Sequence, residues 1–210
     1  MGRPTRGASQ RVITLRRPAE VALATLVEAN RAKPLSYREG LLNRASTARG
    51  WFVDRHRETV GHGVADFEGA CEALRQWEQF HRPWTIAAQP PAPIRIGETV
   101  GYSARALGVW WSYTCRIIDT SDSSSGTLSM FGFDYGTIRG HAECGEERML
   151  VTLDRASGQV WFELFAMSRP GRWFMWFGLP FGRRMQARFR LGAAATFREF
   201  IAQARTAKPL

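Results

Sequence analysis

A histidine and three glutamates lie close together in the sequence, between two predicted strands. They are His141, Glu143, Glu146 and Glu147. An imidazole titrates near neutral pH and a neighbouring carboxylate can fix its tautomer, so His141 oriented by Glu143 is a candidate general acid or base. The flanking Gly140 and Gly145 also permit a structural interpretation, in which the segment is a tight hairpin whose polar side chains satisfy backbone groups.

The same segment has the spacing H-x-E-x-x-E, which offers three metal ligands but no second histidine nearby. The usual zinc and iron ligand sets are not met, so we predict no metal and no cofactor. Gly61 and Gly63 precede a predicted helix, but Asp66 stands where a dinucleotide fingerprint has its third glycine. Nicotinamide binding is therefore not predicted.

Glu163 is a further candidate, and its role depends on the register of one strand. It lies between Trp161 and Phe165 on one face. If that face points inward, Glu163 is a carboxyl in apolar surroundings, with a raised pKa suited to proton transfer or to binding a ligand hydroxyl. If Phe162 and Leu164 point inward instead, Glu163 is a solvated surface charge.

Aromatic side chains alternate along the predicted strands and are candidates to line a pocket. Most aromatic residues on strands fill a core, but so many rings around one helix leave room for a cavity. With His141 and Glu163 as polar anchors, the candidate ligand-binding residues are Trp111, Tyr113, Phe133, Tyr135 and Trp173.

Near the C-terminus, aromatic residues precede arginines, a combination typical of helices that lie on anionic membranes. The arginines are Arg183, Arg184, Arg188 and Arg190, and the aromatic residues begin at Trp173. The alternative is a helix that buries its aromatic face against the protein and exposes its arginines to solvent.

These residues must be positioned by elements that the hydrophobic pattern predicts. Helical spacing predicts helices over 18–30 and 64–80, and a long terminal helix after 171 that Pro180 should kink or break. A strand begins at Trp51, and period-two alternation predicts six more strands in an antiparallel meander. Those six are 84–88, 98–106, 109–119, 127–138, 147–154 and 158–167.

Length and composition fit one folded α+β domain. The chain has 210 residues, 44% of them hydrophobic, and a net charge of +10 concentrated at its two ends. We predict a flexible basic tail over 1–16 and one domain over 17–210. The three cysteines form no C-x-x-C pair, and no apolar run is long enough to span a membrane, so a reducing cytoplasm is expected. Because nearly every basic residue is arginine throughout, the charge is not taken as a signal for specific nucleic-acid binding.

The order of elements resembles helix-grip proteins, the Bet v 1-like and START-like folds, in which about seven antiparallel strands grip the last helix. More specifically, the block Tyr135 to Glu147, read as Y-G-T-x-x-G-H-x-E-x-G-E-E, resembles the DUF1990 family. The Trp110-Trp111 pair and the segment Ser168 to Pro170 add to this resemblance, which extends over about residues 17–205. It implies a small apolar ligand by analogy of fold.

Three functions therefore follow as hypotheses. The first is a binding protein whose cavity holds a small hydrophobic or lipid-like molecule. The second is an enzyme that uses the same cavity for proton transfer, as in a cyclase, isomerase or hydrolase. The third is a peripheral protein that binds an anionic membrane surface or a partner through residues 173–190. The binding protein is the leading hypothesis.

Overall fold

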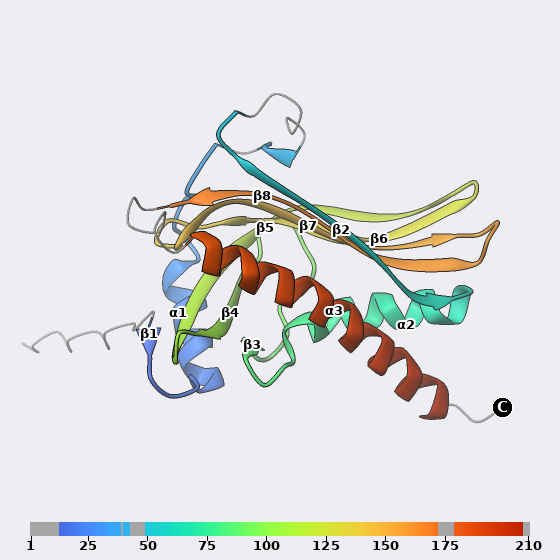
Figure 1. The fold of residues 1–210 in the computed structure, drawn as a ribbon, viewed down its shortest axis with the longest axis horizontal. Helices are drawn as coiled ribbons and strands as arrows, with labels where there is room; N and C mark the ends of the chain where they lie inside the picture. Colours follow the sequence, from blue (N-terminus) through green and yellow to red (C-terminus); the bar gives the residue numbers. More distant parts are fainter. Residues whose placement is uncertain (1–12, 39, 43–48, 172–178, 208–210) are drawn as a thin grey trace, which may run out of the picture.

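A computed structural model describes residues 13–38, 40–42, 49–171 and 179–207 of the chain. Within these residues, three α-helices and one short 3-10 helix (η2) accompany eight strands (Figure 1). The helices are α1 (Glu20–Asn30), α2 (Val64–Arg75), η2 (Glu78–Phe80) and α3 (Leu179–Ala207). The strands are β1 (Ile13–Thr14), β2 (Phe52–His62), β3 (Thr85–Ala87), β4 (Thr99–Ala106), β5 (Val109–Ser125), β6 (Leu128–Thr137), β7 (Glu143–Asp154) and β8 (Gln159–Pro170).

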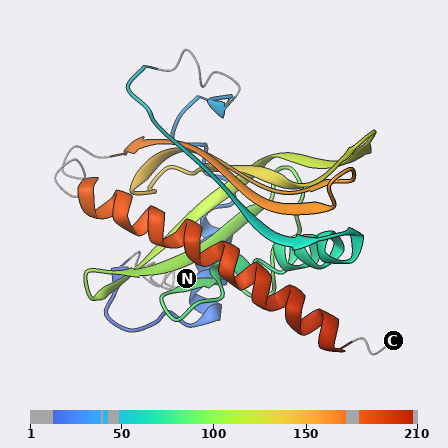
Figure 2. The same cartoon turned by 45° about the vertical axis from the view of Figure 1, so that its right-hand side comes forward.

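The strands form one antiparallel sheet that curves around α3. Its order is β2-β8-β7-β6-β5-β4-β3, and the short β1 pairs with β5 beside this path. Neighbouring strands from β3 to β8 are consecutive in sequence, as the hairpin spacing predicts, and β2 closes the far edge against β8. Figures 1 and 2 show α3 running across the concave side of the sheet. The predicted helix-grip arrangement is confirmed.

The core lies between the concave face of the sheet and the helices α2 and α3. Phe133 on β6, Phe162 on β8 and Phe197 on α3 are completely buried there. The rings of Phe162 and Phe197 have centroids 4.7 Å apart, an ordinary distance for an aromatic pair. This contact fixes the second half of α3 to the sheet.

Helix α1 covers the opposite face of the sheet beside β4 and β5. Its Leu23 packs with Ile86 and Trp110 in a small second core. Because β4 and β5 are covered on both faces in this region, their inward-facing side chains are held in fixed positions. This rigidity matters because these two strands contribute residues to the cavity described below.

The structure corrects two strand boundaries predicted from the pattern. The polar run Thr120 to Ser125 belongs to β5, because pairing with β6 satisfies its backbone despite the weak strand propensity of Ser and Asp. Strand β7 begins already at Glu143, where pairing with β8 continues to Pro170. Pro180 is the second residue of α3, a first-turn position that needs no backbone N–H. Residues 172–178 lie outside the described residues, so the predicted interruption of a longer helix at Pro180 stays a prediction.

The helix predicted over 64–80 is also shorter than expected. α2 ends at Arg75, and Trp77 takes a left-handed backbone conformation with φ of 58° before η2. The Trp77 indole N–H donates to the carbonyl oxygen of Ala92, 2.8 Å away. Near the N-terminus, Ile13 and Thr14 of the predicted tail pair with Trp111 and Trp110. Residues 1–12 lie outside the described residues.

Candidate functional site

A cavity of about 400 Å³ lies between the concave face of the sheet and the first half of α3. Its wall is mostly apolar, with side chains from β4, β5, β8 and α3 and from the segment before β3. The large apolar side chains in this wall are Phe80, Trp84, Trp111, Leu164, Met185 and Phe189. A cavity of this size falls within the range of natural small-molecule sites.

His141 lies in the cavity wall just after a turn in which Gly140 has φ of 105°. Its ring rests against that of Tyr113, with centroids 4.4 Å apart, and its Nε2 lies 3.1 Å from the Tyr102 hydroxyl. Nδ1 is 3.0 Å from the backbone N and 3.1 Å from the carbonyl oxygen of Glu143. Each neutral tautomer of the His141 ring therefore has hydrogen-bond partners at both nitrogens. Burial lowers the pKa of His141 to about 4.

Glu147 on β7 is a buried carboxyl in the cavity wall. The Tyr135 hydroxyl on β6 donates a hydrogen bond to its Oε2. Burial raises the pKa of Glu147 to about 7; the Tyr135 hydrogen bond opposes this rise, and the nearby Glu143 adds to it. Glu147 therefore changes its protonation state near neutral pH inside an apolar cavity.

Glu143 lies on the same face of β7, two positions before Gly145. The Gln186 side chain on α3 donates from Nε2 to its two oxygens, at 3.0 and 3.2 Å. Burial raises the pKa of Glu143, and the amide donor only partly offsets this effect. Hydrogen bonds thus link the Glu143 carboxyl on the sheet to the Gln186 amide on α3 across the cavity.

An ion pair also joins β2 to α3 at the cavity. Asp54 lies 3.5 Å from Nη1 of Arg190 and 3.3 Å from Nη2 of Arg183. Asp54 and Arg190 both line the cavity and are largely buried. Arg188 packs over the ring of Trp84 with its guanidinium carbon 4.6 Å from the centroid. Three of the four arginines that suggested a membrane surface therefore contact the protein itself.

The structure brings most of the predicted site residues together. Trp111, Tyr113, Tyr135, His141 and Glu143 all line the cavity. Phe133 does not: it is fully buried in the core, where its ring packs on Trp77 with centroids 4.9 Å apart. Trp173 lies outside the described residues.

Glu163 lies on the outer face of the sheet. The second of the two possible orientations of this strand, with Phe162 and Leu164 inward, is therefore correct. Phe162 and Leu164 point inward, whereas Glu163 accepts a hydrogen bond of 2.6 Å from Thr152 and lies 3.5 Å from Nε of Arg57. The outer neighbour Trp161 is covered by the Arg57 guanidinium, 3.8 Å from the ring centroid. Apolar residues on both faces of β8 thus have separate partners, and Glu163 is no part of the cavity.

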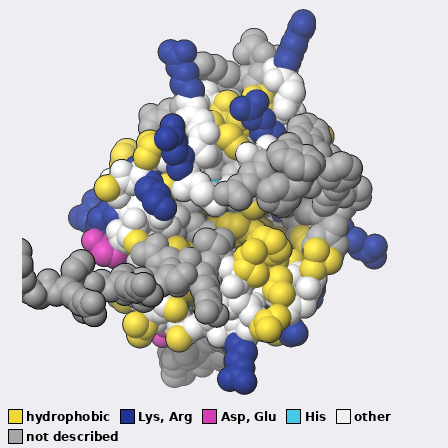
Figure 3. Space-filling model, turned by 90° about the vertical axis from the view of Figure 1, so that its left-hand side faces the viewer, with side chains coloured by type: hydrophobic (Ala, Val, Ile, Leu, Met, Phe, Trp, Pro, Cys, Tyr) yellow, Lys and Arg dark blue, Asp and Glu magenta, His cyan; other side chains and the backbone are white. Residues whose placement is uncertain are grey.

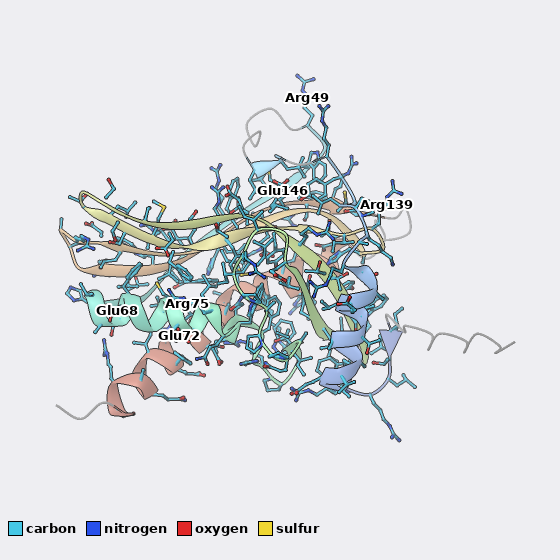
Figure 4. All side chains as sticks on the ribbon, turned by 180° about the vertical axis from the view of Figure 1, so that it is seen from behind. Arg49, Glu68, Glu72, Arg75, Arg139 and Glu146 are labelled. Atoms are coloured by element: carbon cyan, nitrogen blue, oxygen red, sulfur yellow. The ribbon has the colours of Figure 1, made fainter. Side chains whose placement is uncertain are left out.

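Glu146 borders the cavity, but its side chain points to the outer side of the sheet (Figure 4). Its two carboxylate oxygens accept hydrogen bonds from the backbone N–H groups of Gly40 and Leu42, at 2.8 and 2.9 Å. Because Glu143 and Glu146 lie on opposite faces of β7, the H-x-E-x-x-E spacing does not converge on one ion. Over the described ranges, no group of three or more His, Cys, Asp or Glu side chains is arranged to hold a metal.

Glu146→Gln is expected to lower the free energy of unfolding by about 2 kcal/mol, since an amide offers one acceptor oxygen where two backbone donors need partners. Urea denaturation measures this difference. Glu68→Gln is the matched control, because Glu68 is an exposed carboxylate on α2. Equal stability of the two variants would contradict a structural role for Glu146.

The sequence pattern did not single out several residues of this cavity. Tyr102 had a usable signal, since Val100, Tyr102 and Ala104 alternate along one face of β4. Glu147 was in the predicted cluster around His141, but its place on one strand face with Glu143, at period two, was hidden by the expectation of a turn through Gly145. Gln186 and Arg190 carried no local signal, because their partners are distant in sequence.

Hydrophobic side chains gather on the surface at the end of the molecule where α3 begins, with Lys and Arg side chains projecting around them (Figure 3). Leu107, next to the cavity, is 73% exposed. Among the described helices, none has the length and hydropathy to cross a membrane.

Comparison with known proteins extends this description. A UPF0548 protein of Dictyostelium discoideum is 34% identical over 145 residues, covering 65% of this chain and 67% of the relative. A UPF0548 protein of Deinococcus radiodurans is 34% identical over 209 residues, covering 86% of this chain and 98% of the relative. Among solved structures, Ara h 8.0201 matches with a TM-score of 0.46 and 9% identity, covering 73% of this chain and 99% of that one.

The family model described as "Domain of unknown function (DUF1990)" matches residues 36–195, which include the whole block from Tyr135 to Glu147. This agrees with the resemblance found in the sequence, and the chain belongs to the DUF1990 family.

Proposed function

We propose that this protein binds a small, mainly apolar molecule carrying one polar group, in the cavity between the sheet and α3. The observation that carries the proposal is the combination of an apolar wall with a cluster of buried titratable groups. A core that served only stability would close around its apolar side chains instead of leaving about 400 Å³ open beside two carboxyls.

The two parts of the wall suit the two parts of such a molecule. Trp111, Phe189 and Leu164 offer apolar surface, whose burial against a ligand contributes about 25 cal/mol for each Å² removed from water. Glu147, Glu143 and His141 offer hydrogen-bonding groups in surroundings from which water is largely excluded. The ligand is thus oriented by its polar group.

Native mass spectrometry of freshly purified protein, with analysis of an organic extract of the same sample, tests the proposal. A stoichiometric mass excess that the extract identifies as a small, mainly apolar molecule supports it. A clean apo mass together with no uptake of apolar compounds added at high concentration counts against it.

Filling the apolar part of the cavity should weaken binding without unfolding the protein. Ala104 on β4 lines the cavity beside Trp111, its paired residue on β5. The substitution Ala104→Phe places a ring in the open volume. We expect affinity for the neutral dye N-phenylnaphthylamine to fall by about tenfold or more, equivalent to roughly 1.4 kcal/mol. Fluorescence titration measures this change.

Ala202→Phe on the exposed face of α3 is the matched control and should bind the dye like the wild type. If both variants bind with unchanged affinity, the dye occupies another site and the cavity is not where apolar molecules bind.

Proton transfer to or from the bound molecule is a second candidate function. It is favoured by the position of Glu147, a carboxyl with a pKa of about 7 that lines the cavity beside the Tyr135 hydroxyl. Once extraction identifies the ligand, incubation in heavy water tests this function. Deuterium incorporation at carbon that is lost in Glu147→Gln supports it, and no incorporation by the wild type excludes it for that ligand.

A further inference from the structure

The cavity contains more buried carboxyls than cations to pair with them. Three acidic side chains point into it, and of these Asp54 is paired with Arg183 and Arg190. Glu143 and Glu147 have neutral donors, the Gln186 amide and the Tyr135 hydroxyl. Among the described residues, no basic side chain forms an ion pair with either glutamate.

The groups facing Glu147 come from every element packed around it. They are Tyr102 on β4, Cys115 on β5, Tyr135 on β6, Glu143 on β7, Asp54 on β2, and Arg190 on α3. His141 is hydrogen-bonded to Tyr102. Arg190 is the one cation in this set; it lies 3.5 Å from Asp54, which also contacts Arg183, and neither arginine forms an ion pair with Glu147. An ionised Glu147 therefore has no counter-ion in contact with it among the described residues.

Burying an ionised carboxyl without a counter-ion is costly, and a missing counter-ion can be supplied by a ligand. From this arrangement, and resting on the proposed function above, we infer that the cavity binds an organic amine, with its ammonium group against Glu147 and its apolar body against the aromatic wall. An anionic ligand would instead meet two carboxyls, and a neutral ligand would leave Glu147 without a counter-ion.

The neighbouring rings fit the same ligand class. Tyr102 packs on Phe80 with ring centroids 4.7 Å apart and on Tyr113 with centroids 5.7 Å apart, and all three line the cavity. An ammonium group is attracted to the faces of aromatic rings, most strongly where water is excluded. The aromatic wall beside the two glutamates thus accepts a cation as well as an apolar body.

Proton release on binding follows from this inference. Burial holds Glu147 protonated below a pH of about 7, whereas an ammonium ligand pairs with the ionised form. Affinity should therefore rise roughly thirtyfold between pH 5.5 and pH 8, since an alkylammonium stays protonated over this range. A neutral ligand of the same shape has no such dependence.

Three probes with one aromatic body test the inference: naphthylethylamine, naphthylethanol and naphthylacetate. Isothermal titration calorimetry at pH 8 should show the amine binding at least about tenfold more tightly than the alcohol, with the acid weakest. Glu147→Gln removes the charge and keeps the shape of the side chain, so it should abolish both the preference for the amine and its pH dependence. Glu163→Gln, on the outer face of the sheet, is the matched control and should retain both.

The possible failures are distinct. If the alcohol binds as tightly as the amine, the cavity binds apolar molecules but the amine inference is overturned. If the amine preference persists in Glu147→Gln, the ammonium lies elsewhere and the assignment to Glu147 is overturned. If none of the three probes binds and N-phenylnaphthylamine also fails to bind, both the inference and the proposed function fail.

Discussion

The effect of Glu147→Gln on the free energy of unfolding is expected to be about 3 kcal/mol more stabilising at pH 8 than at pH 4.5. In the folded wild type, burial raises the pKa of Glu147 from 4.5 to about 7, so the folded state binds this proton more tightly than the unfolded state. The stability contributed by the protonated carboxyl is complete below pH 4.5 and is lost as pH rises through 7. Glutamine does not titrate, so the variant avoids this loss, at about 1.4 kcal/mol for each unit of pKa shift.

Urea denaturation of wild type and variant at several pH values measures this difference directly. The pH dependence of wild-type stability alone does not isolate the contribution of Glu147, because the contribution of His141 changes with pH in the opposite direction. Burial lowers the pKa of His141 from 6.5 to about 4, so His141 reduces stability as pH falls through this range. This contribution is common to both proteins and cancels in their difference. A constant difference between Glu147→Gln and the wild type would show that Glu147 titrates like an exposed carboxyl.

Phe197→Ala is expected to lower the free energy of unfolding by about 4 kcal/mol. Phe197 is completely buried at the contact between α3 and β8, where its ring packs on Phe162. Truncation removes the burial of a large apolar side chain and leaves a space that the curved sheet cannot easily close, which is the usual cause of losses of 3–5 kcal/mol. Urea denaturation at constant pH measures the change in midpoint.

Gln203→Ala is the control for this variant, since Gln203 lies on the exposed side of α3. Its stability should remain within about 0.5 kcal/mol of the wild type. If Phe197→Ala were equally mild, the second half of α3 would not be held by the contact with Phe162. The cavity would then lack the fixed helix that positions Gln186 and Arg190.

The proposed function depends on a fold in which α3 completes a cavity wall formed by strands β2 to β8. Gln186 contacts Glu143, and Arg190 contacts Asp54, so α3 supplies polar partners to both β7 and β2. The same turns of α3 place Met185 and Phe189 in the apolar wall. Any change that shifts α3 therefore alters both the shape and the charge of the cavity.

The sequence by itself determined the strand meander, the terminal helix and much of the apolar wall. Alternation at period two is strong in β5 and β6, because one face of each strand packs against the core. The pattern therefore assigned Trp111, Tyr113 and Tyr135 correctly to the inner face. The position of His141 after a glycine turn was also local information, since Gly140 needs a positive φ there.

Only the tertiary structure decided the chemistry of the cavity. The register of β8 was ambiguous because both of its faces are apolar, and it was resolved by Arg57, which covers Trp161 on the outer face from another strand. Glu147 and Tyr135 meet through the register of β6 and β7, and Tyr102 reaches His141 across 39 residues of sequence. Such contacts depend on how distant elements pack, and desolvation of a carboxyl follows from that packing rather than from its neighbours in sequence.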